Sequence, residues 1–254
     1  KDWVSFFTGR DVEYLKAPSD SLKVSMFSGV ANLDVVYTPN FDSDRYISGE
    51  RISFYDSNFG RIVGENNKTV ADPDGQWFAD DEIALRLYRN FGSIETALYG
   101  YSGYWKSPAG QTATGIATFP ALSVYGASVR GTVGEGIGNA ELGYYISDDD
   151  TSGDNSLVNN SELRFLLGYT QEIGKNFTAG LQYYLEYMTD YDDFQESGAP
   201  GITSLPRDKD RHLTTLRLTK LLMNQNLTLS LFTFYSPSDE DVYMRPSFNY
   251  KVTD

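Results

Sequence analysis

The residues best suited to do chemistry in this chain are charged side chains at alternate positions of polar and apolar stretches. Period-two alternation places such side chains together on one face of a β-strand. In a water-filled pore, a face of carboxylates, arginines and lysines can set ion selectivity or orient dipolar solutes. The predicted pore-lining residues are Asp34, Glu82, Arg86, Glu162, Arg164, Glu186, Arg245 and Lys251, with Arg130, Glu141 and Arg217 as weaker candidates. The alternative is that they form lumen-spanning ion pairs that stiffen the wall of the pore.

Acidic residues also gather in polar segments between these stretches, and oxygen-rich loops can hold Ca²⁺. The weak calcium candidates are Asp148, Asp149, Asp150 and Asp154. Because this segment lacks the closing glutamate of an EF-hand, it is not that motif. We favour solvated loops, here and in 190–196 and 239–241, over metal sites or divalent bridges to lipopolysaccharide.

No catalytic constellation accompanies these residues. The single histidine, His212, follows a charged segment at a predicted strand end, where a polar rim residue is a simpler interpretation than a base paired with serine. The chain contains no Gly-x-Ser-x-Gly elbow, no phosphate-binding loop and no cysteine. The glycines of 131–138 lie in a turn, which disfavours a dinucleotide site. We therefore expect no enzyme, no catalytic residue and no cofactor, and a lipid-hydrolysing enzyme that uses His212 is the alternative.

The composition suits a wall between lipid and water. The chain contains 19 tyrosines, 15 phenylalanines and 23 glycines, while its mean hydropathy is negative. Membrane β-barrels combine an apolar outer band, aromatic belts and a polar interior. The net charge of −14 argues against a nucleic-acid partner. Because no apolar run approaches the roughly 18 residues of a membrane helix, a membrane-spanning chain would need a closed barrel.

The alternation that predicts strands is regular in several segments. From Val242 to Lys251, every second residue is apolar and the residues between are mostly polar or charged. Ile94–Trp105 and His212–Leu221 are also predicted strands, but neither of their faces is assigned. Further alternating stretches are Phe177–Tyr187, Glu162–Thr170, Leu227–Tyr235, Glu82–Tyr88 and Asn32–Tyr37.

The links between these strands alternate between short and long, which is typical of periplasmic turns and extracellular loops. The predicted short links are Asn90–Ser93, Gly174–Asn176 and Met223–Gln225, with Val133–Asn139 slightly longer. The predicted long links are Thr38–Asp80, Lys106–Phe119, Asp148–Asn160 and Thr189–Arg211.

We predict an all-β chain with one domain over residues 1–254, an antiparallel transmembrane β-barrel of about 10–11 strands. Because bacterial barrels have even strand numbers and Val252–Asp254 lacks a closing aromatic residue, we expect this to be part of a larger barrel, truncated at one or both ends. Lys1–Asp20 would be the tail of an extracellular loop.

The hairpin Asn160–Tyr187 resembles hairpins of porin-like outer-membrane proteins of Gram-negative bacteria, as do Leu122–Gly126 and Arg245–Lys251. The similarity is greatest to the large barrels of the alginate-export type. It covers most of the chain as architecture and carries no substrate-site motif. The resemblance implies a bacterial outer-membrane channel of about 14–18 strands that passes solutes through a polar lumen.

Aromatic residues near predicted strand ends fit belts at the two membrane interfaces. These residues are Trp3, Trp77, Trp105, Tyr37, Tyr104 and Tyr187. The alternative for them is an aromatic track along the lumen, as in sugar-binding channels.

The partners expected from this interpretation are the lipid bilayer, lipopolysaccharide and small polar or charged solutes. The leading hypothesis for function is a diffusion channel. Two alternatives stay open: a barrel sheath that holds a partner protein such as an electron carrier, and a soluble β-sandwich binding module. A homo-oligomer is compatible with each of them.

Overall fold

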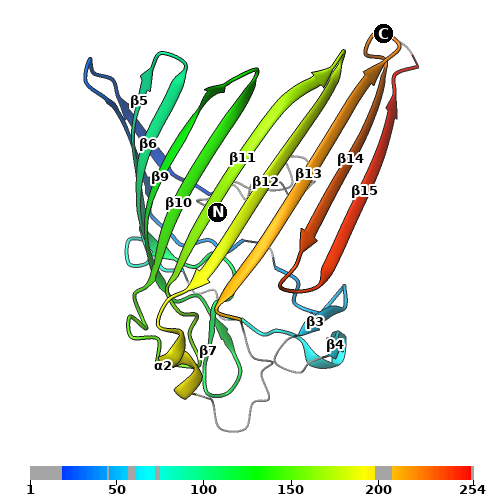
Figure 1. Ribbon diagram of the computed structural model, residues 1–254. Helices are drawn as coiled ribbons and strands as arrows, with labels where there is room; N and C mark the ends of the chain where they lie inside the picture. The colour runs from blue at the N-terminus through cyan, green and yellow to red at the C-terminus, as the bar shows by residue number, and fades with distance from the viewer. Residues whose placement is uncertain (1–18, 45, 57–60, 72–74, 198–207, 253–254) are drawn as a thin grey trace.

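The computed structural model describes residues 19–44, 46–56, 61–71, 75–197 and 208–252 of the chain. Within them, one antiparallel sheet of 11 strands holds most of the regular structure (Figure 1). Its strands are β1 (Leu22–Met26), β2 (Asn32–Thr38), β5 (Glu82–Phe91), β6 (Ile94–Tyr104), β9 (Ala121–Val133), β10 (Gly136–Ser147), β11 (Glu162–Gly174), β12 (Phe177–Met188), β13 (Asp210–Leu222), β14 (Leu227–Ser236) and β15 (Asp241–Tyr250). Strand order follows chain order. The predicted all-β fold is confirmed, and the 11 strands of this sheet agree with the predicted 10–11.

The remaining elements are small and lie in the long links. Two of these links contain hairpins, β3–β4 (Phe54–Asp56, Arg61–Val63) and β7–β8 (Gly110–Gln111, Ala117–Thr118). One turn of 3-10 helix, η1, spans Glu65–Asn67, and the helix α2 spans Tyr191–Glu196. No helix in the described ranges is both long enough and apolar enough to cross a membrane.

Cross-strand pairing divides the side chains of the sheet between two faces. We call them the polar face and the apolar face. One row of the polar face crosses β2 to β13 through Asp34, Arg86, Tyr99, Gly126, Gly143, Arg164, Glu186 and Arg211. The adjacent row of the apolar face contains Leu33, Leu87, Leu98, Ala127, Leu142, Phe165, Leu185 and His212.

Register also assigns the two strands whose faces the alternation leaves open. In β6, Tyr99 lies opposite Arg86, so it belongs to the polar face, and Leu98 belongs to the apolar face. In β13, Arg217 lies opposite Gly180 and Phe232 on the polar face, whereas Leu218 lies on the apolar face. In each of these strands both faces carry aromatic or aliphatic residues, so alternation cannot tell the faces apart and pairing with neighbouring strands decides them.

Short and long links lie at opposite ends of the sheet, as predicted (Figure 1). One boundary is different: the predicted turn Val133–Asn139 is a two-residue hairpin of Gly134 and Glu135, because both strands continue to it. Gly134 has φ +59°, a conformation that glycine adopts without a steric penalty.

The long links are joined to one another by backbone hydrogen bonds. The Asp44 amide donates to the Lys106 carbonyl at 2.8 Å, and the Asn159 amide donates to the Ala109 carbonyl at 2.7 Å. These contacts connect residues 39–81, 105–120 and 148–161. The three links therefore form one assembly at their end of the sheet, which we call the cap.

In the described residues, the two outer strands β1 and β15 each pair on one side only. The structure is thus a curved antiparallel sheet, and the predicted closure into a barrel is not observed (Figure 1). Every residue of β1 and β15 is exposed. Of the predicted loop tail Lys1–Asp20, only Ser19 and Asp20 lie within the described residues.

Candidate functional site

The predicted pore-lining residues share the polar face. Asp34, Arg86, Arg164 and Glu186 belong to the single row given above, and Glu82, Glu162 and Arg245 lie in other rows of the same face. Lys251 follows β15, where its amide donates to the Asn226 carbonyl at 2.9 Å. The three weaker candidates, Arg130, Glu141 and Arg217, are on this face too. Their role in a pore stays a prediction.

Most of these charges have partners close by along the wall. The ion pairs are Lys23–Asp34 at 3.0 Å, Arg86–Glu95 at 2.7 Å, Arg164–Glu162 at 3.2 Å and Arg211–Glu186 at 3.6 Å. Pairs that are open to water contribute little to stability. These four pairs join residues of the same strand or of neighbouring strands, so they stiffen the sheet locally and are not the lumen-spanning pairs of the alternative.

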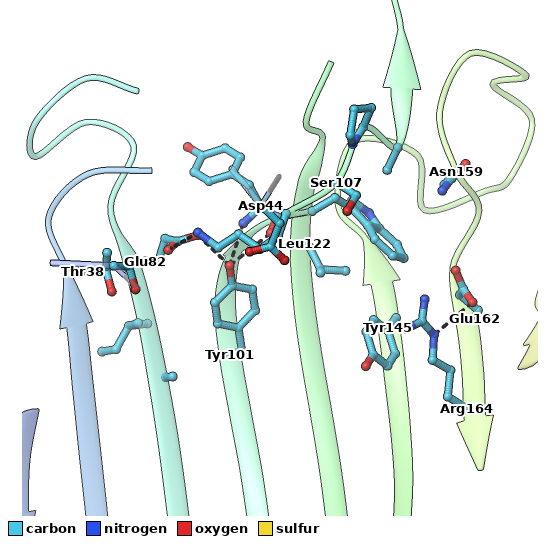
Figure 2. Close-up of a pocket in the computed structure, with 18 of the residues that line it drawn as sticks. Thr38, Asp44, Glu82, Tyr101, Ser107, Leu122, Tyr145, Asn159, Glu162 and Arg164 are labelled. Atoms are coloured by element: carbon cyan, nitrogen blue, oxygen red, sulfur yellow. Dashed lines mark hydrogen bonds and ion pairs between the residues drawn. The ribbon is translucent and has the colours of Figure 1, made fainter. Parts of the chain in front are cut away.

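A cavity of about 320 Å³ lies between the polar face and the cap. Its wall side comes from β2, β5, β6 and β9–β12, and its cap side includes residues 105–109 and Asn159. Figure 2 shows Glu82 and Tyr101 toward one side of it and Tyr145, Glu162 and Arg164 toward the other. The cavity brings carboxylates, cationic groups and aromatic rings together, so we take it as the candidate site.

Glu82 joins the wall to the cap. The Lys106 ammonium lies 2.6 Å from its carboxylate oxygens, and the Tyr101 hydroxyl donates to the carboxylate at 2.7 Å. The side chains of Lys106 and Glu82 are only 14% and 5% exposed, so water screens this pair weakly. Lys106 also donates to the Asp42 carbonyl at 3.1 Å and lies 4.7 Å from the ring centre of Phe41. One lysine thereby holds two links against one strand.

An aromatic stack forms the other side of the cavity. Trp105 and Tyr145 lie 5.9 Å apart at an interplanar angle of 26°. The Arg164 guanidinium lies over the Tyr145 ring at 4.1 Å while it contacts the Glu162 carboxylate at 3.2 Å. Leu122 and Val124 of β9 pack below as a small apolar core. The cavity thus combines aromatic faces with paired charges.

The predicted interface belt is wrong for Trp105. This residue is 8% exposed and lines the cavity, because the link after β6 turns in over the polar face. Tyr104 also lines the cavity and donates to Asp80 at 3.1 Å. Trp77, in contrast, is 62% exposed at the long-link end, and Tyr37 and Tyr187 lie on the apolar face. Trp3 is outside the described residues.

Sequence reasoning missed the residues that complete the cavity. The sequence indicates only that Lys106 begins a long link, and it does not distinguish Tyr101 and Tyr145 from the other tyrosines. Their roles depend on which link folds inward, and alternation within strands carries no information about that. One usable signal existed: Glu82 is an acid at the first position of a strand, where a basic residue in a neighbouring link can reach it.

The acidic segment after β10 is used for turns and strand ends. Asp150 accepts from the Gly153 and Asn155 amides at 3.0 Å, and Asp149 accepts from the Ala121 amide at 2.9 Å. Asp148 and Asp154 accept from serine hydroxyls. Among the described residues, no three acidic or histidine side chains are placed to hold a metal ion.

His212 lies on the apolar face near the long-link end. Its Nδ1 is 2.7 Å from the Tyr183 hydroxyl, and its Nε2 is 2.7 Å from Asp210. Neither ring contact is with a serine. The residue links β12 to β13 at the rim of the sheet.

Arg211 connects the row of Glu186 to the β14–β15 link. Its Nε donates to Asp239 at 2.7 Å, and the Ser236 hydroxyl donates to the same carboxylate at 2.7 Å. Burial alone would raise the pKa of Asp239, but these two hydrogen bonds and the Arg211 charge outweigh it and lower the pKa below 3.8.

Comparison of the chain with protein-family models, with curated proteins and with solved structures gives no match.

Replacing Gly103 with alanine is expected to disrupt the Glu82–Tyr101 contact. An added Cβ would lie 2.5 Å from the Tyr101 hydroxyl oxygen and 3.0 Å from Glu82 Cγ. Overpacking of this kind costs about 1–3 kcal/mol in the free energy of unfolding. Gly100→Ala on the same strand is the control, since its nearest neighbour would be 4.0 Å away. Thermal unfolding followed by circular dichroism measures both, and equal stability of the two variants would contradict the packing.

Asp239 is expected to make the structure acid-sensitive. Because its pKa is lower in the folded chain than the 3.8 of an unpaired aspartate, its contribution to stability is present above about pH 4 and is lost as the pH falls further. The free energy of unfolding should therefore drop less in Asp239→Asn than in the wild type between about pH 5 and pH 3. Exposed Asp241→Asn is the control, and identical pH profiles for wild type and Asp239→Asn would refute the assignment.

Proposed function

We propose that this chain forms the wall of a bacterial outer-membrane channel for small polar solutes, with its apolar face toward lipid and its polar face toward a water-filled lumen. In this proposal, the short links lie on the periplasmic side and the cap on the extracellular side, as in other outer-membrane barrels. In a bilayer the sheet would have to close into a barrel, because lipid offers no hydrogen-bond partner to the backbone of an unpaired edge strand.

The observation that carries the proposal is the exposure of large apolar side chains on the strands of the sheet, most of which lie on one face. Leu167 is 53% exposed, Leu181 is 55% exposed and Phe248 is 70% exposed. Water-soluble monomers rarely expose contiguous apolar patches beyond a few hundred Å². Others on this face are Leu85, Leu87, Leu98, Tyr125, Val129, Leu142, Tyr144, Tyr169, Leu229, Val242 and Met244.

Strand length and the polar face support the same function. The nine strands from β5 to β15 in the sheet have 10–13 residues each, enough to cross a bilayer at a tilt, whereas strands of soluble proteins average about 5–6. In the proposed channel, the cap narrows the solute route at one end of the polar face, where the cavity beside Glu82 and Arg164 lies.

Single-channel recording of the complete protein in planar bilayers tests the function. We expect ohmic conductance that rises with salt concentration. Recovery of the protein in the outer-membrane fraction is the companion measurement. A protein that inserts without conducting would refute the channel, and a protein that is soluble without detergent would refute the membrane wall.

Leu167→Lys is expected to lower the free energy of unfolding in a bilayer by about 2–4 kcal/mol, because Leu167 lies midway along β11 on the apolar face. Thr170→Lys, on the polar face of the same strand, should change it by less than about 0.5 kcal/mol. Folding titrations into lipid vesicles measure both. Since Leu167 is already exposed, a soluble protein would tolerate both substitutions equally, and that result would contradict the proposal.

Lys106→Met is expected to raise the single-channel conductance, because it removes the ion pair that holds the cap against Glu82. Lys175→Met is the control, since Lys175 lies in a short link at the opposite end of the sheet. Unchanged conductance in Lys106→Met would mean that the cap does not limit the route.

A further inference from the structure

Most of the net negative charge of the chain lies at the long-link end of the sheet. The links between strands at the opposite end hold one acid, Glu135, and one base, Lys175, so their charges cancel. At the long-link end, only the link with Lys106 has more basic than acidic residues. The links in which acidic residues outnumber basic ones are 39–81, 148–161, 189–209 and 237–240.

The lining of the cavity under the cap carries the same sign of charge. Four carboxylates line it against two cations, so its formal charge is negative whichever partners these groups have. The carboxylates come both from the cap and from the strands of the wall (Figure 2). The charged lining residues are the acids Asp44, Glu82, Glu162 and Glu186 and the bases Lys106 and Arg164.

The arginine beside Glu186 does not restore the balance of charge. Arg211 Nη1 lies 3.6 Å from the Glu186 carboxylate, but Arg211 Nε lies 2.7 Å from the carboxylate of Asp239. Two carboxylates thus share one guanidinium, and this group of three side chains has a net negative charge. Because Glu186 lines the cavity, the field of the group reaches the proposed solute route.

Burial strengthens the field of the carboxylates around the cavity. The side chains of Glu82 and Glu162 are only 5% and 6% exposed. Clefts with low-dielectric walls and one sign of charge focus the potential and raise the local concentration of counter-ions. Arg217 and Arg245, further along the polar face, are exposed, so water and salt screen their charges more strongly. The cavity should therefore influence passing ions more than the open wall does.

We propose that the capped end of the channel selects small cations over anions, through the carboxylates that line the cavity. Rings of one sign of charge at a constriction are a general basis of ion selectivity. The ion pairs Glu82–Lys106 and Glu162–Arg164 hold the lining in place, and the two further carboxylates, Asp44 and Glu186, give it a net negative charge. This inference rests on the proposed channel function and names the class of solute that the channel prefers.

The reversal potential of the complete protein in planar bilayers, measured across a KCl gradient, tests the selectivity. At about 0.1 M salt, where charges act over about 10 Å, K⁺ should permeate at least about three times more readily than Cl⁻. At about 1 M salt, where this reach shrinks to about 3 Å, the preference should fall. Equal permeability or a preference for Cl⁻ at low salt overturns the inference and leaves the channel intact. A protein that inserts without conducting refutes the channel, and the inference with it.

Glu186→Gln tests the assignment to the cavity carboxylates. Glutamine has the same size and still accepts the hydrogen bond that the Tyr184 hydroxyl donates at 2.9 Å. The ratio of K⁺ to Cl⁻ permeability at low salt should fall by about half or more. Glu135→Gln, the same change in a short link at the opposite end of the sheet, is the matched control and should keep the wild-type ratio. An unchanged ratio in Glu186→Gln, or an equal fall in both variants, overturns the assignment.

A second variant covers the case in which Glu186→Gln fails to fold. Asp44→Asn removes a carboxylate from the cap side of the cavity, while the backbone hydrogen bond from the residue 44 amide to the Lys106 carbonyl is kept. It should lower the permeability ratio at low salt in the same direction. Its conductance at about 1 M salt should match the wild type, because the shape of the route is kept and charge is screened. A wild-type ratio in Asp44→Asn overturns the role of the cavity carboxylates.

Discussion

The regular antiparallel pairing of neighbouring strands, broken in β11–β12 only by a register shift between Glu172 and Gly174, is the constraint on which the other features depend. Because side chains alternate along a strand, a slip of one residue would move every apolar side chain of that strand to the other face. The row from Asp34 to Arg211 holds over eight strands without such a slip. Gly126 and Gly143 occupy its centre, and a side chain added at Gly126 would contact Tyr99. Separation of lipid-compatible and water-compatible surfaces follows from this register.

The cap and the polar face of the sheet together enclose the candidate site. Strands alone give repeating rows of polar residues, and such rows do not distinguish one solute from another. Inward folding of residues 105–109 adds an indole, an ammonium and an apolar lining to one end of the polar face. Glu82 is central to this arrangement since it is satisfied from the wall by Tyr101 and from the cap by Lys106.

The sheet could be predicted from the sequence and the cap could not, for a physical reason. Most strand positions and faces follow from period-two alternation, which is local, so the stretch Val242–Lys251 already indicates its two faces. The faces of β6 and β13 are the exception, because they are fixed only by pairing with neighbouring strands. The stack of Trp105 on Tyr145 joins a residue of the link after β6 to a residue of β10 that is 40 positions further along the chain. Such contacts are set by tertiary packing. For this reason the sequence predicts that Trp105, near a strand end, belongs to an aromatic belt at the membrane interface, whereas in the structure it lines the cavity.

The hydrogen bonds among the three long links make the cap thermodynamically cooperative. Asp44 is bonded to the backbone of Lys106, and Ala109 to that of Asn159, so no link can change its position alone. Substitutions in different links should then be non-additive, which is the behaviour of contacting residues in double-mutant cycles. Natural variation in these segments would be coupled across the links, and an exchange of one link for another sequence would succeed only together with its neighbours.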